Sequence, residues 1–471
     1  MTLARGRELS TARGRLALSL LCLASFMAVV DDTIVTVALP SMRRDLGFSG
    51  ADAQWIFNGY MLAFGGLLLL FGRAADLWGR RRMFLVGLAL FGVSSLLGGL
   101  SPSPWVLIFA RVLQGVGAAA FVPASLSLLT ATFSAGEERN RAIGVYGAMA
   151  ALGFVVGMVG GGVITELLGW RWVLFVNVPV AFAALLAAPA AIPESRDEGA
   201  SRVLDVPGAL TATLGLTALI YAVAETPEGG WGSPVTLGFG ASGAVLLGLF
   251  VFAERRSRAP LVPLGAFRER AVVGPNAAIF LQSMVGLSWL YVLTLYLQDA
   301  LGRSPLEAGL LFLPMTLASV VAAPVAGRLV TRLGIRMTAA SGLALSAAGL
   351  LLTMGMSSGG GLPLVLSGMV IGEAGFMLCN VALTIAGSGG AGEDRKGLSA
   401  GLLNTSIQLG NAWGLGLVAT VVAATTLGDG SASPEALVGG LRWGALACVG
   451  FAVVALSVVL LGLPGGKAQD V

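Results

Sequence analysis

Long apolar runs recur along the whole chain, and no other feature of the sequence constrains its fold as strongly. A bilayer core of about 30 Å requires roughly 20 consecutive apolar residues in a helix. Of the 471 residues, 56% are hydrophobic and 11% are charged, whereas a soluble domain usually carries about 25% charged residues. We therefore predict an all-α polytopic membrane protein with 14 transmembrane helices over 16–39, 53–72, 83–100, 105–127, 141–164, 171–192, 205–224, 234–253, 272–297, 306–327, 337–356, 363–387, 399–426 and 441–463.

The basic residues are distributed unevenly between the loops that join these runs. With the N-terminus in the cytoplasm, the predicted outer segments hold five of the 29 Lys and Arg residues, one lies within a span, and the remaining 23 fall in cytoplasmic segments. This bias is typical of inner-membrane proteins, because positively charged loops stay inside. We predict a bacterial inner-membrane protein with both termini in the cytoplasm, whose first run is an uncleaved span rather than a signal peptide.

Residues that the chain lacks argue against several classes of protein. It has no His, and its three Cys lie within apolar runs, so we expect neither a His-based metal site nor a disulfide framework. It has no G-x-x-x-x-G-K-[ST] motif, which argues against nucleotide as the energy source. The net charge is only +4, and we expect no nucleic-acid surface. We therefore predict no enzymatic activity, no metal and no cofactor, with the proton motive force as the energy source.

Two segments, one after the second run and one after the tenth, are similar to each other. Residues 72–81 read GRAADLWGRR and residues 327–336 read GRLVTRLGIR, with both glycines and two arginines in register. If the chain contains two six-helix repeats, two extra helices must lie between them. We predict an N-terminal six-helix bundle, a two-helix insert with a cytoplasmic linker, and a C-terminal six-helix bundle: 1–192, 193–255 and 256–471.

Several motifs occur in the order found in a known family. They correspond to the first helix, the loop between the second and third helices, the fourth helix and the start of the sixth helix: 30–40, 72–84, 111–117 and 170–179. On these motifs the chain resembles the fourteen-span drug/proton antiporter branch of the major facilitator superfamily over nearly its whole length. It departs from that branch at Val30, Thr36 and Met158, where Leu, Asn and Pro are usual.

The resemblance implies two further groups of functional residues. The loop signature implies a gating motif: Gly72, Asp76, Gly79 and Arg80. The alternative is that its arginines only hold the loop in the cytoplasm. The fifth run carries an antiporter-type glycine motif: Gly144, Gly153, Gly157, Gly161 and Gly162. Small residues repeated every four positions allow tight helix crossing, so this motif is compatible with static packing or with a seam on which the two halves rock.

Charged side chains within apolar runs are costly unless they are paired, so they are functional candidates. Asp31 and Arg111 both fall in the outer half of their spans, at depths that allow them to pair. Glu373 lies near the midplane of the twelfth run. We predict that these three residues couple protons to transport. The alternatives are a structural ion pair for Asp31 and Arg111, and a hydrogen bond to a neighbouring helix for Glu373.

Two expectations concern the surroundings of these acids. Asp32 lies about 100° around the helix from Asp31, so one of the two should face a wet cavity, and the family motif favours Asp31. Gly372 and Gly375 should leave room beside Glu373.

Other polar and aromatic residues within the runs are candidate substrate contacts: Asp32, Gln54, Asn58, Gln114, Gln282, Trp289, Tyr291, Asn404, Gln408 and Asn411. We predict a monomeric proton-driven efflux transporter that exports lipophilic drugs, antibiotics or related metabolites by alternating access. A proton-coupled symporter, a lipid or siderophore exporter on the same fold, and a non-transporting membrane sensor remain alternatives, because fold does not settle function.

Overall fold

The regular elements of the computed structural model are helices, and no strand is present in the ranges that the structure describes: 11–48, 55–195, 205–226, 230–257, 262, 264–303, 305–358, 361–389, 396–427 and 434–463. In the first part of the chain the helices are α1 (Ala12–Leu46), α2 (Trp55–Trp78), α3 (Arg80–Gly99), α4 (Pro104–Thr132), α5 (Glu137–Leu167), α6 (Arg171–Phe175), α7 (Asn177–Ala191), α8 (Val206–Ala224) and α10 (Pro234–Arg256). They are followed by η2 (Leu264–Arg268), α11 (Arg270–Leu295), the π-helix η3 (Tyr296–Ala300), α12 (Pro305–Leu333), α13 (Ile335–Thr353), α14 (Leu362–Gly389), α15 (Lys396–Leu427) and α16 (Pro434–Gly462).

The predicted number of membrane-spanning helices agrees closely with the structure. Within the described ranges, 13 helices are long and apolar enough to cross a membrane, with α6 and α7 counted as one crossing. The remaining predicted span, 205–224, coincides with α8, whose apolar part Pro207–Val223 is shorter. The predicted all-α polytopic architecture is therefore confirmed.

Several helices extend beyond the apolar runs that predicted them. The first run was expected to end at residue 39, but α1 continues to Leu46 and ends at Gly47, whose φ of 70° terminates the helix. At its start, the Thr11 hydroxyl accepts a hydrogen bond of 3.0 Å from the Gly14 N–H. Hydropathy detects only the part of a helix that is apolar enough for hydrocarbon, so polar helix ends are missed.

The two repeated segments adopt the same conformation. We expected residues 72–81 to form a loop, but α2 includes Gly72 and continues to Trp78, so that only Gly79 separates it from α3. Gly334 separates α12 from α13 in the same way. Both glycines have positive φ, 112° and 82°, a conformation that is costly for residues with a side chain. The sequence repeat thus corresponds to a helix–glycine–helix corner in each copy.

The chain divides into two compact units, each of which is described here by itself. Unit 1 comprises Met1–Ala218, Ser242–Ala266 and Ser388–Thr405, and unit 2 comprises Leu219–Ala241, Phe267–Gly387 and Ser406–Val471. Helices α8, α10 and α15 each contribute to both units. The proposed bundle boundaries at residues 192 and 255 stay predictions.

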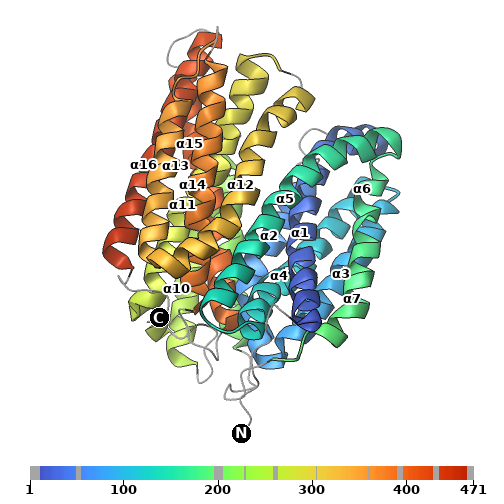
Figure 1. Ribbon diagram of the computed structural model, residues 1–471. Coiled ribbons are helices and arrows are strands. Elements are labelled where there is room, and N and C mark those ends of the chain that lie inside the picture. The colour runs from blue at the N-terminus through green and yellow to red at the C-terminus, as the bar shows by residue number, and fades with distance from the viewer. Residues whose placement is uncertain are drawn as a thin grey trace. The chain divides into compact units, whose positions relative to one another are not determined.

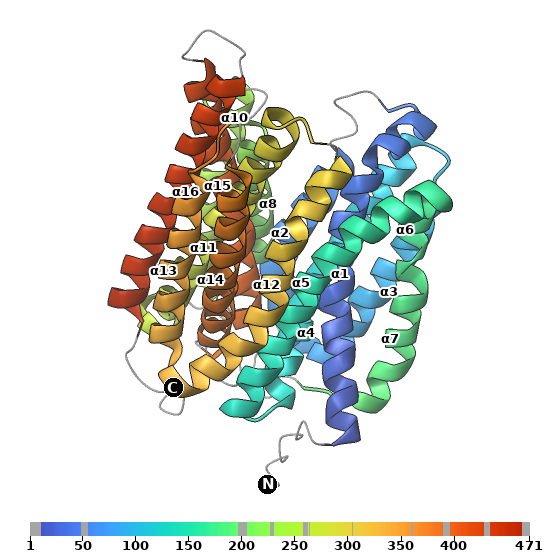
Figure 2. The same ribbon diagram turned by 45° about the horizontal axis from the view of Figure 1, so that its top comes forward.

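In unit 1, α1 packs along α5, and α4 packs against α2 and α3; both views show α1 and α5 side by side (Figures 1 and 2). A Cβ on Gly153 would lie 2.8 Å from the Phe26 carbonyl oxygen, and one on Gly161 would lie 2.9 Å from Ile34. Gly144 is buried, and Gly162 faces Val37 of α1. The face that bears Gly153, Gly157 and Gly161 is therefore occupied by α1 of the same unit, as static packing requires. A seam on which the two halves rock stays a prediction.

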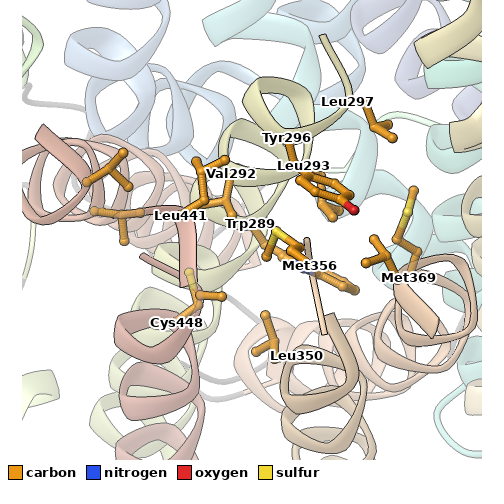
Figure 3. Packing of buried hydrophobic residues seen from close by; sticks show 14 of the residues in the cluster. Trp289, Val292, Leu293, Tyr296, Leu297, Leu350, Met356, Met369, Leu441 and Cys448 are labelled. Carbon is orange, nitrogen blue, oxygen red and sulfur yellow. The ribbon is translucent and has the colours of Figure 1, made fainter. Parts of the chain in front are cut away.

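In unit 2, a core of buried side chains joins α11, α13, α14 and α16. Trp289 is fully buried and packs with Leu350, Met369, Leu441 and Cys448 in this cluster (Figure 3). In a soluble protein, burial of each such side chain stabilises the fold by roughly 1.5–3 kcal/mol. Lipid tails are as apolar as Leu, so this contribution is lost between helices in a bilayer, and close packing has to stabilise helix association instead.

We expect Gly157→Ala to lower the thermal midpoint of the purified protein. Its methyl group would lie 2.9 Å from Thr33 Cβ and 3.0 Å from the Val30 carbonyl oxygen, and overpacking of this kind costs about 1–3 kcal/mol. The matched control on the same helix is Gly160→Ala, because a Cβ there meets only Val156 Cγ1 at 4.0 Å. This control should retain or raise the midpoint. Equal midpoints for the two variants would show that α1 and α5 do not cross at Gly157.

Candidate functional site

An ion pair joins α1 to α4 inside unit 1. Asp31 Oδ2 lies 2.5 Å from Arg111 Nη1, and both side chains are 0% exposed. The sequence predicted that the two residues could pair from their depths, and the structure brings them together. Each charge taken alone would be very costly at this depth, so the pair is tolerated only because both partners are present.

Two amides complete the surroundings of the Asp31 carboxylate. Gln114 Nε2 and Asn177 Nδ2 donate to Asp31 Oδ1 at 3.1 and 2.7 Å. Gln114 Nε2 also lies 2.7 Å from Ser95 Oγ, and Gln114 Oε1 accepts from Arg111 Nη1 at 3.0 Å. Side chains of α1, α4 and α7 therefore meet at one carboxylate, and Ser95 of α3 joins the network through Gln114.

The Arg111 guanidinium also holds α2. Its Nε donates to the Ile56 carbonyl oxygen at 3.1 Å, and its central carbon lies 4.4 Å above the centre of the Tyr60 ring. The face of an aromatic ring attracts a cation, and more strongly when both are desolvated. Arg111 thus connects α2 to the carboxylate of α1.

Asp32 points away from this network. Its side chain is exposed, whereas Asp31 is 0% exposed, so the expectation that Asp31 faces the wet cavity is wrong for this structure. The physical reason is the turn of about 100° per residue, which separates the two side chains. Thr36, one helical turn further along, is also exposed. A carboxylate facing lipid would be costly, so this face of α1 indicates a water-accessible surface.

In unit 2, Glu373 on α14 is half-buried and accepts a short hydrogen bond from the Ser319 hydroxyl on α12. The expected room beside it is absent. A Cβ on Gly372 would lie 2.5 Å from the Trp289 ring, and one on Gly375 would lie 2.5 Å from a backbone oxygen of α13. The expectation was wrong because these glycines allow α11 and α13 to pack closely on α14.

The other candidate substrate contacts differ in exposure. Three are enclosed, with at most 1% of their surface exposed: Gln114, Gln282 and Trp289. Five are half-buried: Asn58, Tyr291, Asn404, Gln408 and Asn411. Gln54 lies outside the described residues. The enclosed side chains hold helices together; for example, Gln282 Nε2 donates to the Phe376 carbonyl oxygen at 2.7 Å. They do not reach an open surface in this structure.

A second buried ion pair forms within the gating motif. Asp76 Oδ1 lies 2.7 Å from Arg80 Nη2, and these side chains are 0% and 3% exposed. The other carboxylate oxygen, Oδ2, accepts from the Leu398 N–H at 2.8 Å. Leu398 is in the first turn of α15, where backbone N–H groups lack partners within the helix and favour a negative charge. Asp76 therefore caps α15 while it pairs with Arg80.

The segment after α7 holds the corner at Gly79. The Arg80 N–H donates to the Ser195 carbonyl oxygen at 2.9 Å, and Arg80 Nη1 donates to the Ser195 hydroxyl at 2.8 Å. The Arg81 N–H donates to Glu194 Oε1 at 3.0 Å. A carboxylate at the start of α3 is favourable for the same reason as at α15. The gating motif is thus connected to α7 and α15 by charge-assisted hydrogen bonds.

At the C-terminal end of α1, Asp45 lies in an open cleft of about 550 Å³. It accepts from Trp170 Nε1 at 2.9 Å and from Arg171 Nη1 at 2.5 Å. These hydrogen bonds, of which the one from Trp170 has the larger effect, hold the pKa of the Asp45 carboxyl below its usual value. Asp45 therefore stays charged at neutral pH and ties the end of α1 to α6.

Most of the chain matches the sequence model of a known family. Residues 21–415 match the family model described as the Major Facilitator Superfamily. The chain belongs to the major facilitator superfamily. The human organic anion transporter MFSD10 (TETRAN), a solved structure, superposes on it with a TM-score of 0.71 at 17% identity, covering 96% of this chain and 100% of that one. This likeness shows that the two proteins share a fold.

Other members of the superfamily are closer in sequence. The puromycin resistance protein pur8 of Streptomyces alboniger is 39% identical over 91% of this chain and 86% of its own length. The cephamycin export protein CmcT of Amycolatopsis lactamdurans is 40% identical over 97% of this chain and 93% of its own length. The chain is therefore similar over nearly its whole length to superfamily members named for antibiotic resistance and export.

Sequence reasoning missed several partners in the site. Asn177 and Ser319 were not assigned to the acids that they contact, and Ser95 was not assigned to Gln114. Each is a single polar residue within or beside an apolar run, a weak signal that any run can carry. Leu398 was missed because it acts through its backbone N–H, which leaves no trace in the sequence. Ser195 was missed because it lies in a loop and acts partly through its carbonyl oxygen.

We expect Arg111→Ala to lower both the yield and the thermal midpoint of this superfamily member. The substitution leaves the Asp31 carboxylate buried without its cation, and removal of one partner of a buried pair costs about 3–5 kcal/mol. The control is the double variant Asp31→Asn/Arg111→Gln, which removes both charges and should recover most of the midpoint. A single variant as stable as the parent protein would contradict the ion pair.

Proposed function

We propose that this protein is a proton-driven exporter of lipophilic drugs, antibiotics or related metabolites. The observation that carries the proposal is its identity of 39% and 40%, over most of both chains, with proteins named for puromycin resistance and cephamycin export. The buried charges within apolar helices support it further, because ionisable side chains at membrane depth are costly and are functional candidates by default. Its partners are then a small lipophilic molecule and protons, and it requires no cofactor.

Proton coupling is assigned to Asp31, Arg111 and Glu373, and Asp32 is added because it is an exposed acid beside the pair. Asp31 has three donors, so it can change its charge only if those contacts rearrange. Asp32 is exposed beside it on α1 and is accessible to protons or to a cationic group without such a rearrangement. A carboxylate whose partners differ between the inward-facing and outward-facing states takes up a proton in one state and releases it in the other.

The gating role is assigned to the Asp76–Arg80 pair. Because Asp76 bonds both Arg80 and the first turn of α15, movement of α15 would break a contact with a buried charge. Such a contact favours one conformational state over the other by its own free energy. We further propose that the protein lies in a bacterial inner membrane with both termini cytoplasmic, on the basis of the distribution of Lys and Arg, and that it acts as a monomer.

The proposal is tested in two steps. A panel of toxic compounds is first screened for reduced toxicity in an efflux-deficient host that carries the protein. A compound found in this way is then added to proteoliposomes with a pH-sensitive dye inside. We expect the compound to cause proton movement in the parent protein and none in Asp31→Asn, because neutral Asn cannot release a proton. The elution volume of the variant on size exclusion controls for folding. Undiminished proton movement in a folded Asp31→Asn variant would refute the coupling role.

A separate prediction concerns Glu373. We expect Glu373→Gln to retain export of neutral compounds and to lose export of lipophilic cations. Loss of a charge-assisted contact of about 1.5–3 kcal/mol weakens recognition by roughly 10- to 100-fold. Resistance of cells to one cationic and one neutral compound, both exported by the parent protein, measures the difference. Equal retention of both would make Glu373 a structural partner of Ser319, and equal loss of both would assign it to coupling.

A further inference from the structure

A small cavity lies between α1, α5 and α7 of unit 1. Its volume is about 110 Å³, and its walls are apolar side chains such as Phe26, Ile34 and Val180, together with Gly160 and Asn177. All three helices belong to membrane-spanning segments. The cavity is therefore at membrane depth, and any molecule that fills it has to be compatible with hydrocarbon.

The rim of the cavity continues into an exposed apolar surface. Val156 of α5 lines the cavity and is 41% exposed. It belongs to a row of exposed apolar side chains at helical spacing on α5: Leu152, Val156, Val159 and Val163. An exposed apolar row of this kind on a membrane-spanning helix is a surface that hydrocarbon chains can cover without cost. The cavity thus opens beside a surface on which an acyl chain can lie.

The cavity exists because Gly160 has no side chain. A Cβ at this position would meet only Val156 Cγ1, at 4.0 Å, whereas its neighbours Gly157 and Gly161 are covered by α1. A larger side chain at Gly160 would project into the open space without a backbone clash. Gly160 is therefore a position at which the cavity can be filled deliberately.

Asn177 connects the cavity to the ion pair. It is the one amide in the cavity wall and is 2% exposed, and its Nδ2 donates to Asp31 Oδ1 at 2.7 Å. A buried water molecule needs two to four polar partners, and apolar cavities stay dry. A wall with one amide that is already bonded to Asp31 does not supply those partners, so hydrocarbon fits this cavity better than water.

We propose that the acyl chain of a membrane lipid occupies this cavity and, by packing on Asn177, holds the amide against Asp31. The bound chain replaces missing neighbour atoms, and dispersion contacts of this kind are individually small but add up. Bilayer lipid is then a ligand of the carboxylate network rather than only its solvent. The proposal does not depend on which compound the protein exports.

The test uses the full-length protein in nanodiscs that contain a phospholipid with a photoreactive diazirine near the end of its acyl chain. After illumination, mass spectrometry of peptides locates the attached lipid. We expect labelling of peptides that contain Met27 or Val156 in the parent protein. Gly160→Leu fills the cavity and should reduce this labelling to background. The control is Gly450→Leu on α16, where a Cβ has nothing within 4 Å, and labelling should persist.

Three results would overturn the proposal. These are absence of label at the cavity in the parent protein, equal labelling in Gly160→Leu, and displacement of the label by an exported compound, which would make the cavity a substrate site.

Should Gly160→Leu not fold, Val156→Phe provides a second way to fill the cavity from its rim. A second measurement follows the thermal midpoint of the delipidated protein as phospholipid is added back. The parent protein and Gly450→Leu should gain stability, and the cavity-filling variant should gain less. An equal gain in all variants would place the stabilising lipid elsewhere.

Discussion

In a hydrocarbon environment a charged side chain cannot form hydrogen bonds with water. Its hydrogen-bonding and charge partners therefore have to come from the protein. The Asp31–Arg111 pair obeys this constraint, since amides from α4 and α7, a backbone carbonyl and an aromatic ring of α2 all contact one of the two charges. Rotation of any of these helices would break a contact with the Asp31 carboxylate or the Arg111 guanidinium and leave that charge without a partner in the membrane. The arrangement of the helices in unit 1 and the chemistry of the site are therefore consequences of the same interaction.

The two copies of the repeat differ at the residues that carry charge. Both copies have a glycine of positive φ between two helices, but Asp76 and Arg80 in the first copy correspond to Thr331 and Ile335 in the second. The backbone corner therefore requires only the glycine. The ion pair and its contact with α15 are additions specific to the first copy, which favours a functional role over a purely structural one.

The sequence predicted features that depend on position along a helix and missed those that depend on rotation around it. Depth follows from a rise of about 1.5 Å per residue, so the meeting of Asp31 and Arg111 could be predicted. Which of Asp31 and Asp32 faces inward depends on how α1 is rotated, and that is set by contacts with α5 that no single-sequence pattern encodes. The expectation about Gly372 failed for a related reason, because a glycine in a membrane helix marks either free space or a close neighbour, and only the neighbouring helix distinguishes them.

The glycines of α5 show how these two meanings combine within one run. Gly157 and Gly161 bring the backbones of α1 and α5 together, which fixes the rotation of α1 and so the direction of Asp31. Gly160 lies between them in sequence but on another face, where its missing side chain leaves a cavity beside Asn177. Close approach on one face and open space on the next follow from the same small residues, because successive positions differ by about 100°. The glycine-rich run of α5 thus packs on α1 and also lines the cavity that we propose to be filled by a lipid chain. Because Asn177 forms part of that cavity wall and donates to Asp31, the packing of hydrocarbon in the cavity affects a hydrogen bond of the ion-pair network.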